Sequence, residues 1–143
     1  MMTSASPDEA LLALRPHLTT PLPTEPDSTT GDFQHRTLRP VLKLQNELLL
    51  TIVADFIQEH HMAFIARDAT EQHRTVAELL GRNVKLRYTI IGSIMGLFTR
   101  AEQDFYRQHR SELNRRILEL ATQRVQSQLA ALAEILTTAG GPA

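Results

Sequence analysis

The stretch Lys85–Thr99, KLRYTIIGSIMGLFT, decides the fold because it is the most apolar segment of this 143-residue chain. One side of it carries bulky apolar residues at helical spacing, namely Ile90, Ile91 and Ile94. Tyr88, Gly92 and Gly96 face roughly the opposite way, and the two glycines let a neighbouring helix backbone come close. We therefore expect this stretch to form the end of a central helix that is buried on two sides.

Two amphipathic helices are predicted up to the end of this stretch, because apolar residues recur there with the helical period. The first runs from Thr37, which suits an N-cap, to about His60. The second runs from about Ala69 to Met95. It follows Asp68, and a glutamate three residues further on resembles the second half of a capping box.

A third helix is predicted from about Arg100 to Leu136. Thr99 and Glu102 form a T-x-x-E capping box at its start, and Gly140 follows its end. At 1.5 Å per residue this helix spans roughly 55 Å, which is longer than either partner. No segment shows sustained two-residue alternation, so the fold class is all-α.

Short connections between long helices predict an antiparallel three-helix bundle with a long C-terminal helix, formed by residues 33–139. The last third of that helix, VQSQLAALAEIL (Val125–Leu136), has an apolar side that the shorter helices would leave uncovered. We therefore expect a homo-oligomer, most simply a two-fold dimer through the C-terminal helix.

Residues 1–32 differ in composition from the rest. They hold five of the seven prolines, with five acidic residues and one basic residue, whereas the remainder holds 14 basic and 11 acidic residues. Such a segment buries too little apolar surface to offset its chain entropy, so we expect a disordered acidic tail. A short helix at residues 8–14 could dock on the body through its leucines or could contact nothing lasting. These leucines are Leu11, Leu12 and Leu14.

The bulk composition indicates a soluble cytoplasmic protein. Hydrophobic residues make up 42% and charged residues 22%, the net charge is −1, and there is no cysteine. The start of the chain, MMTSASPDEA, has neither the basic flank nor the apolar core of a signal peptide. The longest near-continuous apolar run, Tyr88–Thr99, is well short of the roughly 20 residues that a membrane span needs.

Several polar residues interrupt the apolar stripes and are the candidate site residues. Arg87 and Asn83 lie on the second helix, Gln45 and Asn46 on the first, and Asn114 on the third. Buried polar groups must be hydrogen-bonded, so we expect some of them to form one polar layer across the bundle. That layer either fixes the helix register or uses Arg87 to hold a small anion or polar ligand.

Motifs for metal or cofactor chemistry are absent from the sequence. His60 and His61 are adjacent and point about 100° apart in a helix, and His109 with Glu112 is a single pair. No H-E-x-x-H, paired E-x-x-H, P-loop or dinucleotide fingerprint occurs. We therefore expect no metal site and no cofactor, and favour a protein that is not an enzyme.

We do not expect nucleic acid as a partner, despite the arginine-rich third helix. Its basic residues alternate with acidic ones instead of forming a clean stripe, which is typical of a solvated, ion-paired face. The arginines concerned are Arg100, Arg107, Arg110, Arg115 and Arg116.

Three stretches resemble a family of small, uncharacterised bacterial proteins that often carry the automatic label "glyoxalase". They are Phe33–Leu50, Lys85–Thr99 and Asp104–Ile117, and the resemblance covers most of residues 33–128. The label implies chemistry on 2-oxoaldehyde adducts, but the family motifs have no assigned catalytic role. The sequence supplies neither the strand modules of glyoxalase I-type enzymes nor the H-x-H-x-D-H metal motif of the glyoxalase II type.

Our leading interpretation is a non-enzymatic interaction or structural protein, a self-associating helical bundle with a possible protein partner. The alternative is a small-molecule or anion-binding protein, or an enzyme, that uses the polar layer around Arg87. A nucleic-acid-associated protein is the third interpretation.

Overall fold

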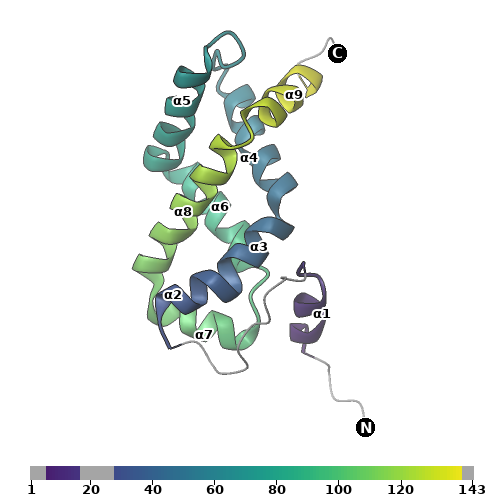
Figure 1. Ribbon diagram of the computed structural model, residues 1–143, viewed down its shortest axis with the longest axis vertical. Helices are drawn as coiled ribbons and strands as arrows, with labels where there is room; N and C mark the ends of the chain where they lie inside the picture. The colour runs from purple at the N-terminus through teal and green to yellow at the C-terminus, as the bar shows by residue number, and fades with distance from the viewer. Residues whose placement is uncertain (1–5, 17–27, 140–143) are drawn as a thin grey trace.

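The computed structural model describes residues 6–16 and 28–139, and this part of the chain is all-helical (Figure 1), which confirms the all-α class. Within the described residues no helix is both long and apolar enough to cross a membrane. The elements are α1 Asp8–Ala13, α2 Thr30–Phe33, the π-helix η1 Gln34–Leu38, α3 Arg39–Leu44, α4 Asn46–Glu59, α5 Ala69–Arg82, α6 Val84–Met95, α7 Arg100–Gln108, α8 Arg110–Gln126 and α9 Leu129–Ala139.

The first predicted helix starts earlier than expected and is divided. Thr29 is its N-cap, and the Thr29 hydroxyl accepts a hydrogen bond from the Asp32 amide at 3.0 Å. Thr37 is therefore not a cap but a buried residue inside η1. Gln45 separates α3 from α4 with φ −92° and ψ 15°. Backbone hydrogen bonds from Gln45 to Val41 and from Leu49 to Gln45 continue across this position, so α4 directly continues α3.

The second predicted helix breaks at Asn83. Its Oδ1 accepts a hydrogen bond from the Leu86 amide at 2.9 Å, and its backbone is extended, with φ −80° and ψ 111°. Asparagine readily caps a helix through its side chain, so it starts α6 instead of continuing α5. The predicted cap at the start of α5 is confirmed, because Asp68 accepts a hydrogen bond from the Glu71 amide at 2.8 Å.

The prediction of a single long C-terminal helix is wrong, because this region forms α7, α8 and α9. The predicted capping box of Thr99 and Glu102 is present at the start of α7. The chain changes course at His109, whose imidazole bonds the Phe105 carbonyl, and again after Gln126. At the second break, Ser127 Oγ donates to the Arg124 carbonyl at 2.7 Å. Side chains that satisfy backbone carbonyls in this way compete with the continuing helix.

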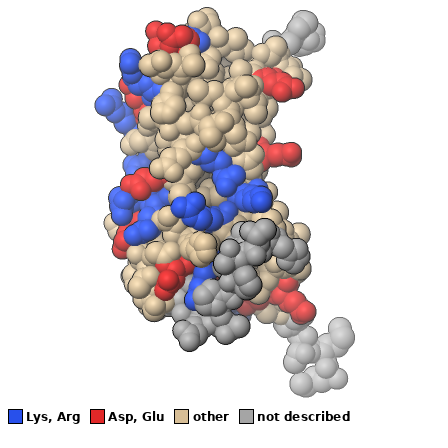
Figure 2. All heavy atoms as spheres, in the orientation of Figure 1, with Lys and Arg blue, Asp and Glu red and all other residues tan. Residues whose placement is uncertain are grey.

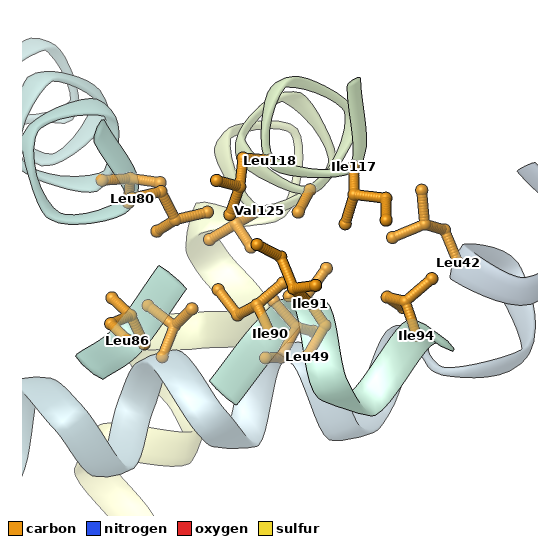
Figure 3. Close-up of a cluster of buried hydrophobic side chains, with 14 of the residues drawn as sticks. Leu42, Leu49, Leu80, Leu86, Ile90, Ile91, Ile94, Ile117, Leu118 and Val125 are labelled. Carbon is orange, nitrogen blue, oxygen red and sulfur yellow. The ribbon is translucent and has the colours of Figure 1, made fainter. Parts of the chain in front are cut away.

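The core lies where α6 passes between α4 and α8 (Figure 3), so the quoted stretch does form a central helix. Ile90, Ile91 and Ile94 are buried, as their spacing predicts. Figure 3 shows them among leucines and isoleucines from the surrounding helices. α5 packs against α6 and α8, and α9 packs mainly against α4.

Burial of α6 on its second side is not observed. Tyr88 is 65% exposed, and Gly92 is exposed with no atom within 4 Å of the position that a Cβ would take. Gly96 is also exposed. The atom closest to the position that its Cβ would take is the carbonyl oxygen of Gly92, which belongs to α6 itself. The glycines therefore bring no helix close to α6 within the described residues.

The apolar side of the C-terminal segment is covered by the same chain. The break after α8 turns α9 across α4 (Figure 1), where Leu132 and Leu136 are buried. The uncovered surface that motivated the dimer is therefore largely absent. Self-association itself stays a prediction.

Candidate functional site

The five polar residues singled out from the sequence lie in separate surroundings. Arg87 is half-buried, and its Nε is buried without a hydrogen-bond partner among the described residues. Asn83 caps α6. Gln45 donates through Nε2 to the Ser93 carbonyl at 3.0 Å, which ties α4 to α6. Asn114 accepts a 2.5 Å hydrogen bond from the hydroxyl of Tyr106.

No side-chain hydrogen bond between described residues joins any two of these five, so they do not form one hydrogen-bonded layer there. The fifth, Asn46, is the only one of them that leads to a larger polar cluster among the described residues. Its Nδ2 donates to Gln128 Oε1 at 2.8 Å, and its Oδ1 accepts from Gln128 Nε2 at 2.7 Å. Arg124 also points its NH1 at Asn46 Oδ1, at 3.4 Å.

The side chain of Arg124 lines a cavity of about 300 Å³ between α3 and α8, which we call the arginine hollow. Figure 2 shows lysine and arginine side chains gathered across the middle of this face, over these two helices. Lys43 lies one helical turn after Arg39 on α3 and is exposed. The lining residues of the hollow are Arg39, Leu42, Leu120, Gln123, Arg124 and Ser127.

The two arginines of this hollow have no carboxylate partner among the described residues. Burial and the neighbouring charge of Arg39 lower the pKa of the Arg124 guanidinium from its ordinary value. Arginine keeps its charge in proteins despite such a shift, so two positive charges share the cavity. Other arginines on α8 differ, because Arg115 and Arg116 pair with Glu119 and Glu112.

A second, larger cavity of about 660 Å³ lies between α4 and α9, and we call it the α4–α9 groove. Its apolar lining comes from Leu50, Ala131 and Ile135, together with the methyl-bearing threonines Thr51 and Thr138. The amides of Asn46 and Gln128 line it as well, and Glu47 and Glu134 stand exposed on its rim.

A separate polar cluster around Glu102 holds α1 against the rest of the protein. Arg15 donates to both carboxylate oxygens of Glu102, at 2.5 and 2.6 Å, and to the Leu97 carbonyl at 3.0 Å. Asp8 accepts from the Arg100 amide at 3.0 Å. Of the three leucines that could dock, Leu12 and Leu14 are 52% and 57% exposed, and Leu11 is half-buried. Polar contacts therefore attach α1.

The histidines of the described residues form no metal-binding group. His60 and His109 each direct Nδ1 to the carbonyl four residues earlier in its own helix, at 2.9 and 3.0 Å. Each ring also stacks on a phenylalanine, Phe56 or Phe105. Across residues 6–16 and 28–139, no three histidine or acidic side chains gather closely enough to hold a metal ion.

Sequence reasoning missed the arginine hollow because Arg39 and Arg124 belong to different predicted helices. Arg124 follows Ile117 and Leu120 at apolar spacing on the third predicted helix, but Arg39 lies about 85 residues earlier in the chain. The available signal was that neither arginine has an acidic residue four positions away on its own helix, whereas Arg115 and Arg116 do.

No protein-family model matches the chain, and comparison with curated proteins and with solved structures finds no match either.

Proposed function

We propose that this protein is a non-enzymatic binding protein whose arginine hollow takes an anionic group, such as the phosphate or carboxylate of a small molecule. The observation that carries the proposal is the pair of guanidinium groups, Arg39 and Arg124, in one cavity without a carboxylate partner among the described residues. An anion between them would satisfy both charges. It would also relieve the repulsion that contributes to the lowered pKa of Arg124.

The chemistry of the lining suits an oxyanion. Guanidinium groups present paired N–H donors whose fork matches carboxylate and phosphate oxygens. The Gln123 side chain lies at the same cavity and can add an amide donor. Ser127 is already engaged, because its hydroxyl donates to the Arg124 carbonyl, and it therefore holds the end of α8 in shape.

Arg87, the arginine favoured from the sequence, supports this function less well. It lines neither the arginine hollow nor the α4–α9 groove. Its partnerless Nε marks an unusual environment, but Arg87 also does not line the two cavities around Met62.

Titration with methyl phosphate, followed by NMR of the arginine Nε–H groups and by thermal shift, tests the proposal. We expect saturable binding and a stabilisation that grows with ligand concentration, because ligands of the folded state raise its stability. Arg124→Met and Arg39→Met should each weaken binding at least about tenfold, since each removes a charge-assisted contact.

The matched control is Arg115→Met, which removes the same charge from α8 outside the hollow, where Arg115 pairs with Glu119. This variant should bind methyl phosphate as the wild type does. Absence of saturable binding, or an equal loss in Arg115→Met, contradicts the proposal. Tight, strongly salt-dependent binding of duplex DNA with equal losses in all three variants would favour the nucleic-acid interpretation instead.

A further inference from the structure

The arginine hollow and the α4–α9 groove meet at a pair of side-chain amides. Arg124 lines the hollow and points NH1 at Asn46, while Asn46 and its hydrogen-bonded partner Gln128 line the groove. Both cavities therefore lie along one seam, in which α3 and α4 run beside α8 and α9. A ligand that lies across these side chains would reach both cavities.

The lining changes character along this seam. The hollow is polar and carries two positive charges, whereas the groove is walled by Leu50, Ala131 and Ile135. The two cavities, of about 300 and 660 Å³, together fall within the usual size of small-molecule sites, which are mostly apolar with a few convergent polar groups.

The charges along the seam also determine how a ligand would be oriented in it. Positive charge lies at the hollow, and the rim of the groove carries the exposed carboxylates of Glu47 and Glu134. A ligand with one negative end is attracted to the arginines and repelled from the groove. The rim carboxylates exclude a second negative charge, and the apolar walls of the groove favour an uncharged portion over a cationic one, because a charge placed against them loses its hydration.

The amide pair limits what that uncharged portion can be. Asn46 and Gln128 bond each other reciprocally, at 2.7 and 2.8 Å, so they offer few free donors or acceptors to a ligand. A peptide backbone laid there would lose hydrogen bonds to water without replacing them. An alkyl chain has no such groups to satisfy and gains by leaving water.

We propose that the ligand is an amphiphile, with an anionic head in the arginine hollow and an unbranched alkyl chain along the α4–α9 groove. This inference rests on the proposed anion-binding function and extends it to a ligand class. The head is a phosphate or a carboxylate, and the experiment below separates the two.

The test measures binding of dodecyl phosphate, dodecanoate, methyl phosphate and dodecyltrimethylammonium by calorimetry, all below the concentrations at which they form micelles. At least one dodecyl anion should bind about 100-fold or more tightly than methyl phosphate, since each buried methylene adds to affinity. The preferred dodecyl anion identifies the head. Arg124→Met should weaken binding of that anion, and the dodecyl cation should bind weakly.

Two variants that fill the groove isolate the chain contribution. Ala131→Phe should remove about tenfold or more of the dodecyl gain and leave methyl phosphate binding unchanged. Thr51→Phe, at an exposed position of the groove, makes the same test if the first variant folds poorly, which circular dichroism would report. Ala77→Phe, on the exposed side of α5, is the matched control and should change neither affinity.

The outcomes separate the two proposals. Equal affinity for methyl and dodecyl phosphate overturns the amphiphile and leaves the anion site standing, whereas no binding of any anion overturns both. Equal binding of the dodecyl cation means unspecific detergent uptake and also overturns the amphiphile. If Ala131→Phe converts a sedimenting dimer into a monomer, the groove is occupied by a second copy of the chain, which overturns the amphiphile too.

Discussion

At the scale of single residues, Glu102 makes the most side-chain hydrogen bonds of any carboxylate in the described part of the chain. Its side chain is 14% exposed and accepts hydrogen bonds from Arg15, from the Thr37 hydroxyl and from the Thr99 amide. Burial raises the pKa of Glu102, but the bonds from Arg15 and Thr99, the charge of Arg15 and the Thr37 bond outweigh it, so its pKa lies below the ordinary value of 4.5.

This carboxylate makes stability depend on pH in the acidic range. Because the folded-state pKa is lowered, the stabilisation is present above the unfolded value of 4.5 and is lost as pH falls through the folded value. We predict that Glu102→Gln lowers the free energy of unfolding at pH 7 by about 2–3 kcal/mol, because it weakens a largely buried ion pair. Urea denaturation at several pH values measures this.

The pH profile provides the control for that substitution. The difference between wild type and Glu102→Gln should shrink as pH falls below 4.5. Glu119→Gln, at an exposed pair with Arg115, should change stability by less than about 0.5 kcal/mol. A gap for Glu102→Gln that is constant from pH 7 to pH 3 would show that the carboxylate charge is not the cause.

Residue by residue, the sequence anticipated polar contacts better than it anticipated the cavity. Asn46 was selected because it interrupts an apolar stripe, and it does connect with Gln128 and Arg124. Arg39 and Arg124 meet only through the packing of helices that are far apart in sequence. Helical periodicity describes one helix at a time, so it gives no information on such a pair.

At the scale of helices, the N-caps at Asp68 and Thr99 were predictable, the one expected at Thr37 was wrong, and the breaks were not predicted. Asp68 and Thr99 start helices as expected because their motifs are local in sequence. The breaks at Asn83, His109 and Ser127 leave the apolar period intact. At each break a side chain forms a hydrogen bond with the backbone and competes with the hydrogen bonds of a continuing helix. The spacing of apolar residues contains no information on this competition.

The open face of α6 allows a test of its glycines. Gly92 lies within the helix, is exposed and has no atom within 4 Å of the place that an added methyl group would occupy. We predict that Gly92→Ala raises the free energy of unfolding by about 0.5–1 kcal/mol, because alanine loses less backbone entropy in a helix. Chemical denaturation with an unchanged m-value would measure this.

Gly96→Ala is the comparison for this variant, because its Cβ would lie 3.1 Å from the Gly92 carbonyl. That substitution should stabilise less than Gly92→Ala or should destabilise. If Gly92→Ala instead destabilised the protein in a concentration-dependent way, α6 would be in contact with a second copy through this face.

At the scale of the whole molecule, one chain covers most of its own apolar surface. The exposed large apolar side chains include Leu48 on α4 and Val84 with Tyr88 on α6. The predicted overhanging helix is absent because α9 turns onto α4. The fold class was thus predictable from composition and period, whereas the path of the C-terminal segment depended on one break.

Self-association through the C-terminal helix remains a prediction, and sedimentation equilibrium tests it. If α9 contacts a second copy, it must do so with its outward side, where Ala130 is exposed. Ala130→Arg should then convert the dimer into a monomer, since two such charges would meet across a two-fold interface. A wild-type chain that is monomeric at every concentration contradicts the dimer.

The seam between α3–α4 and α8–α9 joins residues 82 positions apart, as in the pair Asn46 and Gln128. Contacts across so long a loop tend to form after local helix formation, because closing the loop costs entropy before it gains stability. A ligand held there therefore stabilises the native state more than the folding transition state. Its kinetic effect should be a slower rate of unfolding at an almost unchanged rate of folding.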